Sequence, residues 1–151
     1  MSAGTSFLHN LGFWCAVVAW TLAQSIKLTT RFIRTREIDF RLLASTGGMP
    51  SAHTAMVCAL ATSVGLQAGF GSPLFALALA FAAVVMFDAQ SVRRAAGLQA
   101  RLLNQIIQEL FQEHHLSRQK LAEVLGHTRL EVSAGLVTGV VVALILHALA
   151  R

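Results

Sequence analysis

Three short groups of polar residues interrupt an otherwise apolar chain, and each holds residue types that can bind or transfer an anion. The first is the stretch GGMPSAH at 47–53, which stands directly before a long apolar run. Glycines such as Gly48 let backbone N–H groups converge, and proline suits the first turn of a helix, whose N-terminus attracts anions. Ser51 would donate a hydrogen bond there, and His53 would be a proton donor or base. The stretch predicts a phosphate cradle, with a plain turn before a helix as the alternative.

The second group is a pair of cations, Lys27 and Arg34, which stand seven residues apart. Seven residues are about two helical turns, so both side chains would lie on one side of a helix and clamp one anion. The alternative is the basic flank of a membrane helix, with both side chains reaching for the lipid surface.

The third group is His127 and Glu131, four residues apart at the start of the last apolar run. At helical spacing the carboxylate can accept from one ring nitrogen and leave the other directed outward. A nucleophilic or basic histidine is held in its tautomer in this way. A polar pair at the membrane interface, without chemistry, is the alternative.

A further charged group, Asp88 with Arg93 and Arg94, directly follows an apolar run. Ionisable groups at membrane depth are costly, so they indicate a functional site. The alternative is a salt bridge that fixes this helix against a basic loop.

Composition places these groups in a membrane protein. The chain has 151 residues, of which 55% are hydrophobic and 13% charged, with a mean hydropathy of +0.62. This length predicts a single membrane-embedded domain over 1–151. The pI of about 10.6 does not indicate a nucleic-acid partner, because the basic residues are not interleaved with aromatic ones. Cys15 and Cys58 lie inside apolar runs and are expected to be small buried residues rather than a disulfide.

The apolar runs predict an all-α helical bundle in the membrane. Four membrane helices are expected, at about 11–26 and continuing past Lys27, at 50–68, from 73 to 87, and at 130–149. Residues 69–73, GFGSP, predict a tight turn between the second and third helices. In the fourth, Gly135 and Gly139 have the small-xxx-small spacing that permits close packing on a neighbouring helix.

Two further helices are expected outside the membrane core. Residues 98–111 have apolar positions at helical spacing with polar ones between them, which predicts an amphipathic helix lying along the membrane face. A short helix that Ser117 could cap and Gly126 could end follows it.

The distribution of charge predicts the orientation. Eleven of the twelve Lys and Arg residues fall in the segments 27–46 and 88–129. The positive-inside rule then places both segments in the cytoplasm, together with all the candidate site residues.

The ordered set of motifs resembles a known superfamily. Lys27 with Arg34, the PSAH sequence at 50–53, and His127 with Glu131 are similar in order to the three signature motifs of the type 2 phosphatidic acid phosphatase and vanadium haloperoxidase superfamily. GGMPSAH, FDA with VRR at 87–94, and LGH to EV at 125–132 resemble its small divergent branch of bacterial and plastid membrane proteins. The resemblance covers most of the chain, from Lys27 to the end of the last helix.

The resemblance implies a phosphatase that uses neither a metal nor a cofactor. In that mechanism His127 attacks phosphorus, Glu131 orients it, and His53 protonates the leaving oxygen. The residues implied to hold the phosphate oxygens are Lys27, Arg34, Ser51, one of Arg93 and Arg94, and the backbone at Gly48, with Asp88 pairing one of the cations.

The chain departs from the superfamily pattern at four places. Thr35 stands where proline is usual, Ala52 where glycine is usual, and Glu131 where aspartate is usual. The arginine that normally stands a few residues before the nucleophilic histidine is absent, because residues 123–126 are EVLG. Arg93 or Arg94 would have to supply that charge.

Two functions follow as hypotheses. The first is a multi-pass protein of the bacterial plasma membrane that hydrolyses a phospholipid or polyprenyl phosphate or diphosphate at the cytoplasmic face. The second is a catalytically weak relative that binds or translocates phospholipid head groups, or a membrane scaffold. Whether the chain forms a homo-oligomer is left open. The remaining histidines, His9, His114, His115 and His147, are expected to lie outside the site and to bind no zinc.

Overall fold

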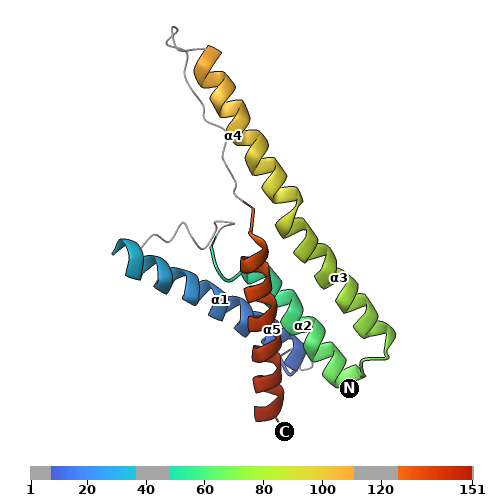
Figure 1. The fold of residues 1–151 in the computed structure, drawn as a ribbon. Helices are drawn as coiled ribbons and strands as arrows, with labels where there is room; N and C mark the ends of the chain where they lie inside the picture. The colour runs from blue at the N-terminus through green and yellow to red at the C-terminus, as the bar shows by residue number, and fades with distance from the viewer. Residues whose placement is uncertain (1–7, 37–47, 111–125, 151) are drawn as a thin grey trace.

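The computed structural model describes residues 8–36, 48–110 and 126–150. Over these residues the chain forms helices and no strand, which confirms the predicted all-α fold (Figure 1). The helices are α1 (Leu11–Thr35), α2 (Ala52–Ala68), α3 (Pro73–Gln90), α4 (Val92–Leu110) and α5 (Arg129–Leu149).

Several of these helices can cross a membrane. Within the described residues, three segments are long and apolar enough to do so, namely Leu11–Ile33, Pro73–Ile107 and Arg129–Leu149. The remaining helix of the bundle, α2, has 17 residues and is about 26 Å long at 1.5 Å per residue. The chain is therefore a membrane protein with several candidate spans.

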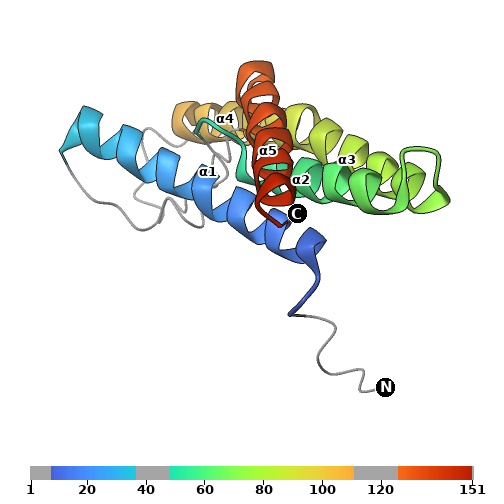
Figure 2. The same cartoon turned by 90° about the horizontal axis from the view of Figure 1, so that it is seen from below.

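The centre of the bundle is α2, which packs against α1, α3 and α5 (Figures 1 and 2). α1 crosses it in the opposite direction, because Gly12 at the start of α1 lies near Ser63 toward the end of α2. α5 runs parallel to α2, since residues near the two helix starts are hydrogen-bonded to each other. This arrangement brings the starts of α2 and α5 to one end of the bundle.

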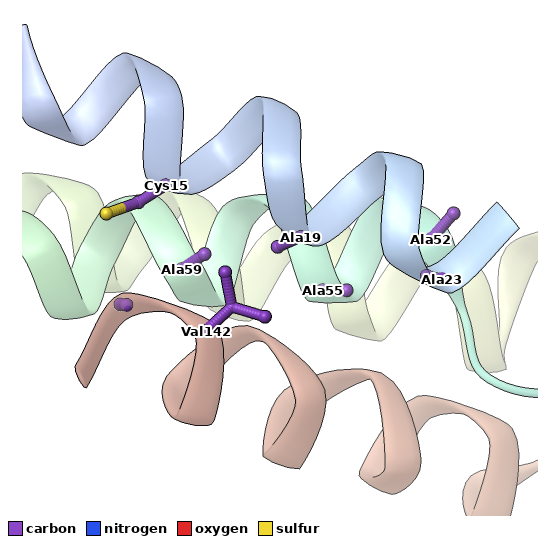
Figure 3. Close-up of a cluster of buried hydrophobic side chains, with 8 residues drawn as sticks. Cys15, Ala19, Ala23, Ala52, Ala55, Ala59 and Val142 are labelled. Carbon is purple, nitrogen blue, oxygen red and sulfur yellow. The ribbon is translucent and has the colours of Figure 1, made fainter. Parts of the chain in front are cut away.

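The core of these three helices is made of small side chains. α1 contributes Cys15, Ala19 and Ala23 at a spacing of four, and they face Ala55 and Ala59 of α2 (Figure 3). All five are fully buried. Small residues let helix backbones approach closely, which is how membrane helices associate where lipid is as apolar as the core.

The hairpin between α2 and α3 forms as predicted. Residues 69–72 connect the helices, Pro73 is the first residue of α3, and Ser72 caps it. The rings of Phe70 and Phe75 meet edge to face, with centroids 5.1 Å apart. Most large side chains of α3 are exposed, as expected for a helix that faces lipid.

The amphipathic segment is helical from Val92, six residues earlier than predicted. Ser91 alone separates α4 from α3, and α4 leaves the bundle nearly in line with α3 (Figure 1). Its apolar residues Leu98, Leu102 and Ile106 are exposed. That α4 lies along the membrane face stays a prediction. The short helix expected between Ser117 and Gly126 lies outside the described residues.

The two glycines of α5 contact α2, which identifies the neighbour that their spacing predicted. A Cβ added at Gly135 would lie 2.5 Å from the carbonyl oxygen of Ser51, and one at Gly139 would clash with the carbonyl oxygen of Ala55. Only glycine therefore fits at either position without moving the helices apart.

Candidate functional site at the starts of α2 and α5

The start of α5 is a capping box that also holds His127. Thr128 is the N-cap residue: its side chain accepts from the N–H of Glu131 (3.3 Å), and Glu131 Oε2 accepts from the N–H of Thr128 (2.9 Å). The same Oε2 lies 3.1 Å from Nδ1 of His127. The carboxylate therefore both starts the helix and orients the imidazole.

This contact assigns the chemistry of the His127 ring. An ionised carboxylate only accepts hydrogen bonds, so Nδ1 carries a proton, and in the neutral ring Nε2 has the lone pair. The side chain is buried, with 3% of its surface exposed. Its backbone N–H donates to the carbonyl of Ala89 in the last turn of α3 (3.0 Å). The ring is thus fixed at both its backbone and its Nδ1 side, as a nucleophile or base requires.

A buried lysine lies near this pair. Lys27 is in the second half of α1, is 5% exposed, and lies within electrostatic range of the Glu131 carboxylate. Its aliphatic stem packs against Gly48, where an added Cβ would lie 3.6 Å from Lys27 Cδ. Gly48 has a φ of +95°, a left-handed conformation that favours glycine. Lys27 is thus buried between helices and does not reach for the lipid surface, and its clamping of an anion together with Arg34 stays a prediction.

Ser51 links the glycine-rich stretch to α5. Its N–H donates to the carbonyl of Glu131 (2.9 Å). Its hydroxyl oxygen caps α2 and accepts from the hydroxyl of Thr54 (3.1 Å), and both side chains are fully buried. α2 begins at Ala52, so Pro50 stands before the cap, in a cis peptide bond with Met49, and not in the first helical turn as predicted.

The cradle expected at 47–53 is therefore only partly available to an anion. The Ser51 N–H is already bonded to α5, so it cannot also donate to a phosphate. The donors that this end can offer an anion include the Ser51 hydroxyl and the Lys27 ammonium, together with the positive end of the α2 dipole.

The other predicted site residues lie around this cluster. His53 is exposed in the first turn of α2, and Asp88 is partly buried one residue before Ala89, whose carbonyl binds His127. Both have interactions of their own. Their proposed roles, proton donation and pairing with a cation, stay predictions.

The predicted arginines are placed by their backbones alone. Arg34 lies in α1, two turns after Lys27, and Arg93 and Arg94 lie in the first turn of α4. Their side chains are outside the described part of the structure, as are His114 and His115. Which of Arg93 and Arg94 approaches His127 therefore stays open.

Sequence reasoning missed two residues of the cluster. Thr128 could have been found, because Thr128 and Glu131 form the T-x-x-E pattern of a capping box before an apolar run. Thr54 has no comparable signal, since a threonine inside an apolar helix is usually bonded to its own backbone.

No metal site is evident in the described ranges, where no three His, Cys, Asp or Glu side chains lie close enough to hold an ion. The chemistry that the cluster can perform is that of an oriented imidazole beside a buried ammonium. Such a pair can attack, or bind, a group that carries negative charge.

Comparison with known proteins identifies the family of the chain. A family model described as the Divergent PAP2 family matches residues 8–142, which include all the predicted site residues. The uncharacterized membrane protein YuiD of Bacillus subtilis (strain 168) is 39% identical over 150 residues, covering 92% of this chain and 95% of the relative. No solved structure matches the chain. The chain belongs to the Divergent PAP2 family.

Proposed function

We propose that the protein is a membrane phosphatase that hydrolyses a lipid phosphomonoester or diphosphate through a phosphohistidine. The observation that carries this proposal is the contact of His127 Nδ1 with Glu131 Oε2, with the buried Lys27 within electrostatic range of the same carboxylate. In the proposed mechanism His127 Nε2 is the nucleophile, and the positive charge of Lys27 stabilises the phosphate oxygens.

The reaction has two steps. His127 Nε2 attacks phosphorus and forms an N–P bond, the bond from phosphorus to the ester oxygen breaks, and His53 gives that oxygen its proton. A water molecule, deprotonated by His53, then attacks the phosphohistidine and releases inorganic phosphate. Lys27 and the Ser51 hydroxyl stabilise the charge on the phosphoryl oxygens during both transfers.

A lipid substrate is supported by the apolar residues next to the cluster. Met49 adjoins Gly48 and is 56% exposed, and Leu130 adjoins Glu131 and is 76% exposed. A phosphate could meet Lys27 while the acyl or prenyl chain stays in contact with these side chains and the surrounding bilayer.

Translocation of a head group through the bundle is a weaker candidate. The α1, α2 and α5 interface beyond the site is filled by the fully buried Ala19, Ala23, Ala55 and Ala59, with Gly139 in close contact with α2. A polar head group would have to separate these helices to pass between them. Binding without hydrolysis is then the main competitor, and an activity assay decides between the two.

The assay measures phosphate release by protein purified in detergent. We expect hydrolysis of at least one member of a panel of phosphatidic acid, phosphatidylglycerophosphate and polyprenyl phosphates. EDTA should leave the rate unchanged, and vanadate should inhibit because it adopts the geometry of the transferring phosphoryl group. Binding of these lipids with no release would favour the binding function, and a rate lost to EDTA and restored by magnesium would exclude metal-free phosphohistidine chemistry.

We further propose that the site faces the cytoplasm, because eleven of twelve Lys and Arg residues fall in the segments on its side. A cysteine at Ser72, in the hairpin at the other end, should react with a membrane-impermeant reagent added to intact cells. A cysteine at Ser117 should react only after permeabilisation. The unaltered protein, whose Cys15 and Cys58 are buried, gives the background, and the reverse labelling pattern would place the site outside.

A further inference from the structure

A second polar cluster lies at the opposite end of α2 and α5 from the candidate site. Ser63 of α2 is fully buried, and its hydroxyl oxygen is 2.8 Å from Nε2 of His147 in α5. Gln67 donates to the same oxygen through Nε2 (2.9 Å). Polar groups are costly inside a membrane bundle, so a buried polar contact between two helices calls for a reason.

The two helices meet along a seam that repeats every four residues. Gly135 contacts Ser51 and Gly139 contacts Ala55, so equal steps along the parallel helices keep matched positions together. The last matched position is the Ser63 and His147 pair. The seam residues are Ser51, Ala55, Ala59, Ser63 and Gln67 on α2, and Glu131, Gly135, Gly139, Ala143 and His147 on α5.

The small residues of this seam define its register only in part. If α5 slid by one turn, about 5.4 Å, Gly139 would face Ser51 and Ala143 would face Ala55, where glycine fits best. Sliding the other way would place Gly135 against Ala55 and Gly139 against Ala59, with Glu131 opposite Ser51. Either shifted register needs the helices to move apart at one contact only, so the glycines favour the observed register without being its sole determinant.

The polar ends of the seam discriminate further. In either shifted register the buried Ser63 loses His147, which faces Ala59 or Gln67 instead. A polar contact to a buried residue that forms in only one alignment is a known means of fixing helix register. The hydrogen bond from Ser51 N–H to the Glu131 carbonyl fixes the other end.

We propose that the Ser63–His147 hydrogen bond sets the register of α5 on α2 and thereby positions His127 and Glu131 at the other end. Glu131 precedes His147 by sixteen residues, about 24 Å along α5. His147 is therefore a positioning residue that acts through the helix. The placement of His127 follows from the structure alone, and only the effect on turnover rests on the proposed function.

The Ser63 hydroxyl can serve either tautomer of His147. Its oxygen has two lone pairs and one proton, so while it accepts from Gln67 it can donate to, or accept from, His147 Nε2. Glutamine at position 147 has an amide with both an acceptor and a donor and could replace either bond, whereas leucine could not.

The test compares His147→Leu, His147→Gln and Ser63→Ala by NMR of protein labelled with ¹⁵N in histidine. The His127 ring gives the readout, because its Nδ1 proton reports the contact with Glu131. We expect a shifted or second His127 signal in His147→Leu and Ser63→Ala, and the unaltered signal in His147→Gln. Thr62→Ala is the matched control, since the Thr62 hydroxyl bonds within α2 to the carbonyl of Cys58 (2.8 Å).

Turnover gives a second readout. In His147→Leu, kcat should fall roughly tenfold or more with KM changed little, because misplacement of a reacting group acts mainly on the chemical step. His147→Gln should restore it. If His147→Leu fails to fold, Ser63→Ala removes the same bond with a smaller change in volume.

An unchanged His127 signal in both Ser63→Ala and His147→Leu, with only a lower melting temperature, would overturn the proposal and leave the pair a merely stabilising contact. If the wild-type protein released no phosphate while the His127 signal still responded to position 147, the proposed function would fail and the register proposal would stand.

Discussion

His127→Ala is expected to abolish phosphate release, with a loss on the order of 10⁴-fold or more. The side chain is the proposed nucleophile, whereas His53, an exposed residue in the first turn of α2, is proposed only as the proton donor. A labelled phosphoenzyme trapped from the wild-type protein should be absent from the variant. Hydrolysis that persists in His127→Ala would exclude the phosphohistidine mechanism.

Glu131→Gln separates the orientation of His127 from its presence. Glutamine also suits the third position of a capping box, so its oxygen can still accept from the Thr128 N–H and α5 can still begin at Arg129. The amide lacks the charge that stabilises the His127 imidazolium and weakens the hold on its tautomer. A reduced but measurable rate is therefore expected, rather than a complete loss.

His53→Ala is the matched control for removing a histidine at this end. A general acid matters most when the departing oxygen needs a proton, so this variant should still turn over an ester of a good leaving group such as 4-nitrophenol. Its rate on a lipid phosphate should fall much further. The two histidine variants thus distinguish nucleophile from acid within one assay.

Much of the helical framework could be predicted because the membrane interior, which surrounds these helices, is apolar. Continuous apolar runs locate α1, α3 and α5, and the predicted start of α5 differs from the observed one by a single residue. Pro73 and the glycines before it mark the hairpin, since such residues cannot continue a helix. The spacing of the two glycines in α5 also predicted a close helix contact, although it could not identify α2 as the partner.

The departures arise where tertiary contacts decide the outcome. α1 runs on through the polar residues to Thr35, and Thr29, Thr30 and Thr35 satisfy their hydroxyls on their own helix backbone. α2 begins after Pro50 because Ser51 supplies the cap and its N–H is taken by α5. The start of α2 could not be predicted from local sequence, because it depends on α5 lying alongside.

The sequence predicted which residues belong to the candidate site better than it predicted the hydrogen bonds between them. The spacing of His127 and Glu131 predicted their contact, and the structure confirms it. Ser63 and His147 are 84 residues apart, so no short pattern connects them, and the sequence predicted only that His147 lies outside the site. A role for Ser63 and His147 can be inferred only once the packing of α5 on α2 is known.

Lys27→Met is expected to lower kcat/KM roughly 10²- to 10³-fold, the usual cost of removing one charge-stabilising donor from a buried site. Methionine keeps a flexible apolar stem against Gly48 and removes only the ammonium, so the packing of α1 changes little. Lys27→Arg should not restore the rate, because the guanidinium is wider and planar and cannot replace a compact ammonium at a buried position.

The control for Lys27 is Arg31→Met, which removes an exposed cation one turn further along α1. Its effect should stay within about twofold, because exposed charges act weakly through water. The experiment also has to exclude a second role for the buried Lys27, that of a counter-ion to Glu131. If Lys27→Met loses no more activity than Arg31→Met while its melting temperature falls, Lys27 serves the fold by neutralising Glu131. The other outcome is that Lys27→Met loses both vanadate inhibition and kcat/KM while the protein still elutes as the folded species. In that case the Lys27 charge acts on the phosphoryl group.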